Sequence, residues 1–425
     1  GLVELQDSVF MLITEANIRR GHCGSLLFNG DNNDRYQVKL ADKKQVAEKT
    51  WVSPWRVLII GGLSDIVEST LVTDVSDPSK VEYTEWINPG MVSWIYWAYN
   101  HGSKDLAAEM HWPYNLIDWE WDEMSNGGNL QDAVKYTLNK GIKPLLWYNS
   151  STNWIGPGPL FRLNKKQDRE KEYAWLSEMG IAGIKVDFFS GDSVSTMNYY
   201  IDLLEDAIKY KLMLNFHGAT IPRGWQRTYP HMMSVEGVYG AEWYNNAPIL
   251  TNRAAEHNAT LPFTRNVVGP MDYTPGTFSN SQHPHITSYA HELALPVIFE
   301  SALQHMPDRP SVYYGLPEPV KRLLSELPVA WDDTKLLAGY PGEEVILARR
   351  KGDVWYIGGI NGTNETKTLH ISLDKIAVSD KKISIFKDGI DDKHFAIEEN
   401  IPLANVKSDL TIECLPRGGF VAVIK

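Results

Sequence analysis

The chain has 425 residues, 43% of them hydrophobic, and a formal net charge of −12 at pH 7. This length suits one large barrel with additional domains, and the apolar fraction can build a sizeable core. The negative charge argues against nucleic acid as a partner, because a phosphate backbone requires a basic surface. No run of eighteen apolar residues occurs, so we expect no membrane span.

Residue usage gives two further indications. The two cysteines, Cys23 and Cys414, lie near opposite ends of the sequence, so they indicate neither a disulfide framework nor a clustered metal site. Fifteen tryptophans and twenty tyrosines are present. Aromatic faces pack against the C–H faces of sugars, and tyrosine and tryptophan also offer a polar edge. A tryptophan-rich core explains the same composition equally well.

Residues 1–82 have the pattern of an antiparallel β unit, which we interpret as part of a β-sandwich. Alternating or β-branched stretches, separated by Gly and Asn-Asp, predict strands at residues 9–18, 35–41, 55–62 and 68–75. The sequence begins directly in a strand pattern, and no signal peptide is visible. We therefore expect a processed or truncated chain.

Residues 83–328 alternate between strand and helix patterns. Apolar runs predict strands at 92–100, 114–122, 143–151, 183–192, 212–220, 231–238 and 265–273. Amphipathic stretches predict helices at 129–141, 164–180, 193–211, 285–304 and 318–328. Two stretches remain open for an eighth strand, "SVYYGLP" from 311 and "VIFE" from 297. Such alternation with nearly continuous apolar strands predicts a parallel (β/α)8 barrel.

Residues 329–425 return to short strands, predicted within 343–362, 367–373, 382–389 and 409–425. We interpret them as an antiparallel β domain. The stretch "DDTKLLAGYPG", residues 332–342, is predicted to be a loop between the domains. The fold class is therefore α/β, a barrel with β domains on both sides.

Polar and aromatic residues follow the predicted barrel strands. They are Asp118, Glu120, Asp122, Trp147, Tyr148, Asn149, Asp187, Asn215, His217, Glu236, Glu242 and Asp272. Barrel active sites form where the strands end, so these side chains are expected to converge on one face. Two carboxyl groups among aromatics and amides are typical of a sugar-cleaving site.

Each of these residues also has an ordinary interpretation. Asp187 could cap the following helix, Glu236 and Glu242 could be solvated loop charges, and His217 could be a core histidine. Lys185 could bind substrate or pair with Asp187. A zinc hydrolase barrel requires His-x-His at the first strand, which contains no histidine here. A serine esterase requires G-x-S-x-G, which does not occur in the sequence.

Four stretches of the sequence resemble glycoside hydrolase family 97. They are "FMLITEANI", "GIKVDFFSGD", "NFHGATIPRGWQRTYPHMMSVEGVYGAEWYNN" and "RNVVGPMDYTP". The resemblance implies a partial N-terminal β-sandwich at 1–82, a catalytic barrel at 83–328 and a C-terminal β domain at 329–425. It also implies calcium in the active site and a periplasmic or secreted location. The family's sandwich is longer than the first 82 residues, so the chain resembles only its last part.

The family divides by mechanism, and one position separates the branches. The inverting α-glucosidase branch has a glutamate directly after the histidine of the fifth strand, where this chain has Gly218. The retaining α-galactosidase branch lacks that glutamate and ends its fourth strand on an aspartate nucleophile, here Asp187. By the same resemblance Glu242 is the acid/base, and Glu15, Glu236 and Glu242 are calcium ligands, which suits the preference of calcium for oxygen.

The resemblance predicts a calcium-dependent retaining exo-α-galactosidase that hydrolyses terminal α-galactosides of oligosaccharides by double displacement. The acid must be protonated at the start, so the pKa of Glu242 should lie above that of Asp187. From their positions at strand ends we predict that substrate is bound by Asn149, Lys185, His217, Asp118 and Arg223, with Trp147 and Trp225 as stacking platforms. An α-glucosidase on the same scaffold and a non-catalytic carbohydrate-binding protein are the alternatives, and the oligomeric state is open.

Overall fold

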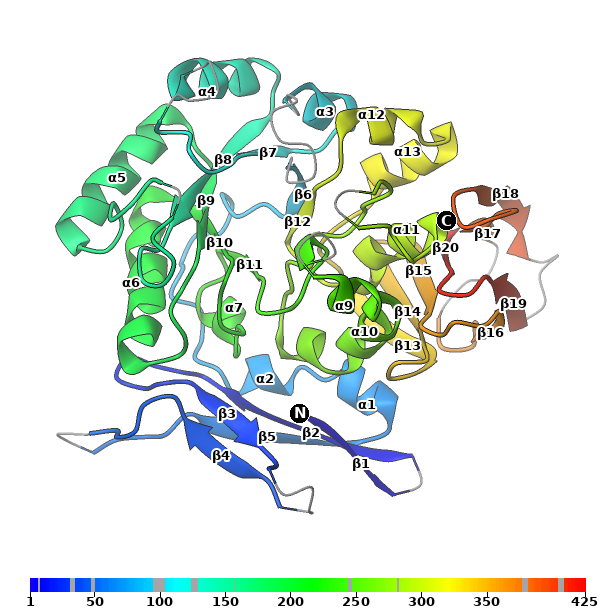
Figure 1. The fold of residues 1–425 in the computed structure, drawn as a ribbon, viewed down its shortest axis with the longest axis horizontal. Coiled ribbons are helices and arrows are strands. Elements are labelled where there is room, and N and C mark those ends of the chain that lie inside the picture. The colour runs from blue at the N-terminus through cyan, green and yellow to red at the C-terminus, as the bar shows by residue number, and fades with distance from the viewer. Residues whose placement is uncertain are drawn as a thin grey trace.

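Three β regions follow one another along the chain (Figure 1). The computed structural model describes residues 1–6, 8–30, 35–46, 50–94, 104–123, 129–156, 158–243, 247–280, 283–376, 381–403 and 409–425. The N-terminal strands lie along one side of the barrel, and the C-terminal strands lie beside its last helices (Figure 1). No helix within these described ranges is long and apolar enough to cross a bilayer.

The N-terminal region is a small antiparallel sheet in the order β1 (Leu2–Gln6), β2 (Val9–Ala16), β5 (Trp55–Gly61). Strands β3 (Ser25–Phe28) and β4 (Gln37–Leu40) pair separately. Alternate residues of β2 and β5 are buried, as a half-buried strand requires. They pack against the short helices α1 (Leu63–Val67) and α2 (Leu71–Asp74).

The predicted strand at 68–75 is wrong, because this stretch contains helix α2. The Thr70 hydroxyl donates to the Asp74 carboxylate at 2.7 Å, and the Thr73 hydroxyl donates to the Thr70 carbonyl at 2.7 Å. Such local side-chain bonds compete with a strand ladder. Val72 supplies the buried apolar contact of this turn.

The barrel is a parallel sheet of seven strands in the order β11-β10-β9-β8-β7-β6-β12. Its strands are β6 (Gly90–Ser93), β7 (Tyr114–Ile117), β8 (Lys143–Asn149), β9 (Gly183–Asp187), β10 (Met213–Phe216), β11 (Met232–Val235) and β12 (Leu303–Met306). This confirms the barrel architecture. The barrel is nearly closed, because β11 and β12 end the sheet and are not paired with each other within the described residues. The first predicted strand, 92–100, is observed as β6, and residues 95–100 lie outside the described residues.

The seventh and eighth strand predictions are corrected by the structure. Within the predicted strand 265–273, Arg265–Val268 forms a 3-10 helix and Met271 makes a single bridge to Val235. The Arg265 guanidinium donates hydrogen bonds to five backbone carbonyls around this segment. These bonds hold the segment in a compact, non-extended path. The eighth strand is β12, whereas both predicted candidates lie in or beside helices.

Helices cover the outside of the barrel. They are α3 (Lys104–Glu109), α4 (Leu130–Asn139), α5 (Lys166–Met179), α6 (Val194–Tyr210), α7 (Trp225–Thr228), α9 (Pro248–Thr251), α10 (Ala254–Thr260), α11 (Tyr289–Ile298), α12 (Pro310–Gly315) and α13 (Glu318–Glu326), with a 3-10 turn at Leu261–Phe263. The five predicted helices are confirmed. Asn129 and Ser193 cap α4 and α6 with their side-chain oxygens, and Gly180 ends α5 in the left-handed conformation.

The C-terminal region is an antiparallel sheet in the order β13-β14-β15-β20-β17-β18, with β16 and β19 paired separately. Its strands are β13 (Asp333–Tyr340), β14 (Glu344–Lys351), β15 (Val354–Asn361), β16 (Lys367–Ser372), β17 (Lys382–Asp388), β18 (Phe395–Pro402), β19 (Asp409–Cys414) and β20 (Gly419–Ile424). The predicted loop at 332–342 is wrong, because most of it is β13, whose Leu336 and Leu337 are buried. Helix α11 is buried throughout and packs on β15 and β20, which joins this sheet to the barrel.

Candidate active site

Asp187 is the last residue of β9 and lies buried at the mouth of the barrel. Its Oδ1 accepts from the Phe188 backbone N–H at 2.7 Å, and its Oδ2 accepts from Trp147 Nε1 at 3.3 Å. Burial raises the pKa of Asp187, although His217 and Lys185 oppose that rise. Each carboxylate oxygen has one donor in these contacts, so lone pairs remain for attack on an electrophile.

Gly218 lies against the same carboxylate. Its φ is +50°, and a Cβ built on it would be 2.9 Å from Asp187 Oδ1 and 2.8 Å from the Phe188 nitrogen. Any side chain at this position would therefore collide with Asp187 or displace it. This backbone excludes a glutamate at 218 while Asp187 occupies its observed position, which gives a physical reason for the glycine that the sequence analysis singled out.

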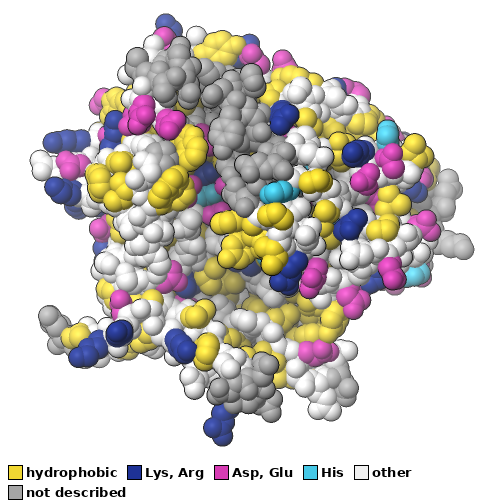
Figure 2. Space-filling model, viewed as in Figure 1, with side chains coloured by type: hydrophobic (Ala, Val, Ile, Leu, Met, Phe, Trp, Pro, Cys, Tyr) yellow, Lys and Arg dark blue, Asp and Glu magenta, His cyan; other side chains and the backbone are white. Residues whose placement is uncertain are grey.

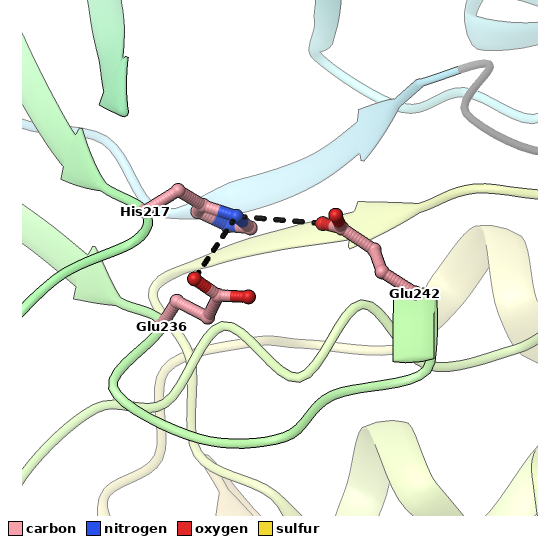
Figure 3. Close-up of side chains that lie close together, drawn as sticks. All are labelled: His217, Glu236 and Glu242. Atoms are coloured by element: carbon pink, nitrogen blue, oxygen red, sulfur yellow. Dashed lines mark ion pairs between the residues drawn. The ribbon is translucent and has the colours of Figure 1, made fainter. Parts of the chain in front are cut away.

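His217, Glu236 and Glu242 converge after β10 and β11 (Figure 3). His217 Nδ1 lies 3.4 Å from Glu242 Oε1 and 3.8 Å from Glu236 Oε2. Glu236 Oε2 also accepts from the Gly218 N–H at 2.6 Å. Burial and Lys185 lower the pKa of His217, but the carboxylates of Glu236 and Asp272 outweigh them and hold it well above the ordinary value. The imidazole is therefore held as a cation, with Nε2 donating to Asp272 and Nδ1 facing the two glutamates in ion pairs.

Asp272 holds the other edge of that imidazole. Its Oδ2 accepts from His217 Nε2 and from Asn215 Nδ2, each at 2.7 Å, and lies 2.8 Å from His305 Nδ1. The carboxylate is completely buried. Asp272 was recognised only as a strand-end residue, and His305 was missed because β12 was not predicted. The arrangement fixes the ring of His217 with Nδ1 directed at the two glutamates.

Lys185 is the second fixed cation of the site. It lies buried on β9, two residues before Asp187, with Nζ 3.8 Å from the centre of the Trp94 ring. Burial lowers its pKa, but the surrounding carboxylates, Glu242 first and then Asp118 and Asp187, outweigh burial and raise it. Asp118 accepts from the Trp94 indole and from the Trp119 N–H. The structure thus brings Lys185, Asp118, His217, Asp187 and Glu242 together as predicted.

The pKa shifts of the two catalytic candidates, each measured from its own ordinary value, run against our expectation. Burial raises the pKa of Glu242, but Lys185 and His217 outweigh burial and lower it below the ordinary value. The pKa of Asp187 is raised. The carboxyl group with the largest resolved rise at the mouth is Glu236, whose pKa burial raises to about 7. Sequence did not show that Lys185 and His217 outweigh burial at Glu242 but not at Asp187.

Glu236 and Glu242 fit a hard cation. The ligand atoms of His217, Glu236 and Glu242 lie within 4.8 Å of one another. Glu242 Oε1 is buried and makes no hydrogen bond with the described residues. Two close carboxylates and an unbonded buried oxygen suit an ion that prefers oxygen ligands, whereas the imidazole does not. We therefore assign the fit to the two glutamates alone.

Glu15 lies in a different cluster. One of its oxygens accepts from Arg223 Nε at 2.6 Å and from the Ser25 N–H at 2.8 Å, and the other accepts from Arg56 at 2.8 Å and from the Ser25 hydroxyl. It does not join the group of ligand atoms around Glu236. The structure gives Glu15 a saturated ion-pair environment, and its role as a metal ligand stays a prediction.

The substrate-binding assignment of Arg223 is not supported. Its guanidinium is buried and donates to Glu15, to Asp192 at 2.7 Å, to the Thr220 hydroxyl and to the Ile221 carbonyl at 3.2 Å. Strand-end position suggested the assignment, but the side chain points towards the N-terminal sheet. It joins β2 to the loops that follow β9 and β10.

Three other predicted substrate contacts stay predictions, and the structure shows what each side chain contacts. Trp225 is buried in the apolar core, and its indole donates to the Ile18 carbonyl at 2.8 Å, so it offers no stacking face. Trp147 is also buried and presents its edge to Asp187 rather than a face to solvent. The amide of Asn149 is used by the Trp154 carbonyl at 3.0 Å and the Ser151 N–H at 2.7 Å. Sequence position cannot distinguish such local bonding from substrate contact.

Comparison with known proteins places this geometry in a family. Models described as glycoside hydrolase 97 N-terminal, glycoside hydrolase 97, and glycosyl-hydrolase 97 C-terminal, oligomerisation, match residues 1–78, 99–238 and 330–425. A probable retaining α-galactosidase of Streptomyces bingchenggensis is 34% identical over 82% of this chain. A retaining α-galactosidase of Bacteroides thetaiotaomicron is 31% identical over 88%. The matches span 56% and 60% of those two proteins, less than two thirds of either.

Solved structures give the same result for the fold. A β-arabinopyranosidase superposes with a TM-score of 0.90 at 28% identity, covering 99% of this chain and 71% of that one. A glycoside hydrolase family 97 enzyme variant of Pseudoalteromonas sp. superposes with a TM-score of 0.83 at 25% identity, covering 99% and 73%.

Proposed function

This chain belongs to glycoside hydrolase family 97, and from that premise we propose that it is a retaining α-galactosidase that removes terminal α-galactosyl residues from oligosaccharides. The observation that carries the proposal is the pairing of Asp187 with Gly218. A carboxylate ends β9, and the position where an inverting branch member has a glutamate has no room for a side chain. The names of the two relatives support the choice of substrate.

In the first step Asp187 attacks the anomeric carbon. A bond forms between that carbon and an Asp187 oxygen, and the bond to the glycosidic oxygen breaks as Glu242 transfers a proton to it. The Phe188 N–H holds Asp187 in place during this step. In the second step water attacks the same carbon, gives its proton to Glu242 and releases Asp187, so two inversions return the α configuration.

The acid role requires a proton on Glu242 when substrate is bound. In the structure Lys185 and His217 lower the pKa of Glu242, whereas burial raises it. The side chain of Glu242 is still 19% exposed. A sugar that covers it removes the remaining water and so strengthens burial, the largest effect that favours the protonated acid. Lys185 and Asp118 are left to bind the sugar hydroxyls.

We also propose that calcium binds at Glu236 and Glu242. When bound, the ion would supply positive charge that polarises sugar oxygens and neutralises carboxylate charge. Dialysis against a chelator should abolish turnover and lower Tm, and calcium should restore both. At one hundred times its Kd a native-state ligand adds about 2.7 kcal/mol of stability, which a thermal melt detects without substrate. Full activity with no metal by elemental analysis would remove this part of the proposal.

The test of the reaction is proton NMR of an aryl α-galactoside digest during the first minutes, before mutarotation. Appearance of α-galactose first supports retention, whereas β-galactose first would show inversion and would limit Asp187 to positioning water. An aryl α-glucoside in parallel tests the alternative substrate. Binding without cleavage of any of these glycosides would favour a non-catalytic carbohydrate-binding protein.

A second substrate is favoured by one comparison. The β-arabinopyranosidase superposes over 99% of this chain. A β-L-arabinopyranoside has the ring configuration of an α-D-galactoside without its hydroxymethyl group, so one nucleophile can serve both. The ratio of kcat/KM values for the two aryl glycosides measures the contribution of contacts to that group.

A further inference from the structure

We propose that Tyr239 and Trp243 form the binding site for the leaving group, a pyranose or aryl ring on the far side of the bond that is cleaved. We call these two side chains the aromatic pair. This inference rests on the proposed function and deepens it, because it names the class of leaving group that the site accepts. Nothing in the comparisons assigns a role to either residue.

The aromatic pair lies beside the acid in the chain. Trp243 directly follows Glu242, and Tyr239 precedes it by three residues. Their ring centroids are 5.3 Å apart with an interplanar angle of 89°, an edge-to-face contact. Tyr239 is 56% exposed, whereas Glu242 reaches inward to His217. The turn thus carries the acid on its inner side and an exposed aromatic ring next to it.

The stereochemistry of double displacement selects this side of the site. The nucleophile attacks from the face opposite the leaving group, and the acid must touch the glycosidic oxygen. The leaving ring therefore departs next to Glu242 and not next to Asp187. The exposed Trp154, which contacts Phe188 at 4.7 Å between centroids, lies on the nucleophile side and is excluded by the same argument.

The backbone below the aromatic pair is fixed. The Ala241 N–H donates to the Tyr273 carbonyl at 2.9 Å, and a Cβ on Gly240 would lie 2.6 Å from that oxygen, so only glycine allows this approach. The Tyr239 carbonyl contacts His257 Nε2 at 3.0 Å, from helix α10. A ring on such a fixed turn loses little freedom when a ligand packs on it.

In the view of Figure 2, hydrophobic side chains lie beside a recess in which histidine and acidic side chains are visible. An aromatic face at the border of a polar recess suits the C–H face of an outer sugar, while the inner sugar meets Lys185 and Asp118. The inner sugar is thus recognised by polar contacts, and the leaving-group ring is recognised by an aromatic contact.

The experiment compares substrates with and without a ring as leaving group. We would measure kcat/KM for α-galactosyl fluoride, whose leaving group is one atom, and for an α-galactosyl disaccharide. Tyr239→Ala should lower the disaccharide value about fivefold and leave the fluoride value within twofold, because one aromatic contact contributes on the order of 1 kcal/mol. Tyr239→Phe should restore most of the loss. Tyr136→Ala, an exposed tyrosine on α4, is the matched control and should change neither value.

The outcomes separate this inference from the proposed function. Equal loss on both substrates, or no loss on the disaccharide, overturns the aromatic pair as a leaving-group site. A selective loss for Trp154→Ala instead of Tyr239→Ala overturns the argument from stereochemistry. Failure of the wild-type chain to release fluoride overturns the proposed function. In that case calorimetric titration of the Asp187→Asn variant still decides the inference, which fails if disaccharide binds no tighter than galactose or if Tyr239→Ala leaves the difference intact.

Discussion

Two groups of buried carboxylates in this molecule are built in opposite ways. At the junction between the N-terminal sheet and the barrel, both Glu15 oxygens accept two donors each, and two arginines balance the charge of Glu15 and Asp192. At the barrel mouth, Asp187, Glu236 and Glu242 share His217 and Lys185, and one Glu242 oxygen has no hydrogen bond among the described residues.

The number of hydrogen-bond donors around each carboxylate distinguishes a structural group from one that can take part in chemistry. Both Glu15 oxygens already accept two donors each, so in this arrangement the Glu15 group holds two regions together. A group of carboxylates with too few hydrogen-bond donors leaves oxygens available for a ligand. Burial, together with Glu242 and Asp187, raises the pKa of Glu236 to about 7. Buried polar atoms are normally satisfied, so the exceptions at the mouth indicate where a substrate or a cation completes the site.

The largest effect is expected for the nucleophile. Asp187→Gly should lower kcat by roughly 10⁴-fold or more, because no other group can form the covalent intermediate. The space left by the carboxylate should admit azide, which attacks the anomeric carbon and yields β-galactosyl azide. Product analysis by NMR checks the configuration. A folded variant that azide cannot rescue would weaken the assignment of Asp187.

The junction should show a large effect on stability. Arg223→Met leaves Glu15 and Asp192 without their shared partner, and breaking a buried pair costs about 3–5 kcal/mol. Denaturant unfolding measures this loss. Glu15→Gln in the same chain should recover part of it, because it removes one of the two negative charges that Arg56 alone cannot balance. Purely additive losses would show that the pair is not coupled.

A substitution at Gly218 tests the close contact between the end of β10 and Asp187 at the end of β9. Gly218→Ala places a Cβ 2.9 Å from Asp187 Oδ1 at a φ of +50°, which should cost about 1–3 kcal/mol and displace the nucleophile. We expect kcat to fall by at least about tenfold with a modest fall in Tm. Gly352→Ala, at a φ of +56° with no atom within 4 Å, is the control for strain alone. Equal effects in both variants would show that the conformation, not the contact with Asp187, matters.

The architecture was predictable because it depends on periodicity. Apolar runs and caps predicted β8, β9, β10 and the helices α4, α5 and α6, each of which repeats a simple pattern. The strand at 265–273 was wrong because its path depends on Arg265, which binds carbonyls of residues distant in the chain. Sequence patterns cannot show such a tertiary contact.

The site was predictable to the same extent. Strand-end position brought Asp187, Lys185 and His217 to the mouth correctly, since parallel strands end at one edge. It did not show that the side chains of Arg223 and Trp225 turn towards the N-terminal sheet and the core. It also did not show the directions of the Asp187 and Glu242 pKa shifts, because these depend on the balance between burial and the two cations at each carboxyl group.

The smallest effect is expected where pairing occurs without burial. Glu205 on α6 binds Lys80, Arg20 and Tyr229 and joins the N-terminal segment to the barrel, as Glu15 does, but its side chain is 30% exposed. Burial raises its pKa, but the bonds from Lys80, Arg20 and Tyr229 outweigh burial and lower it to about 2 from the ordinary 4.5. The stability it contributes is present above pH 4.5 and is lost as the pH falls towards 2. Solvent screening limits that contribution to about 1 kcal/mol. Unfolding of the wild-type chain and of Glu205→Gln should therefore differ at pH 6, converge near pH 2 and differ less in high salt. A difference as large as that of Arg223→Met would contradict the view that burial, and not the number of partners, separates the two junction contacts.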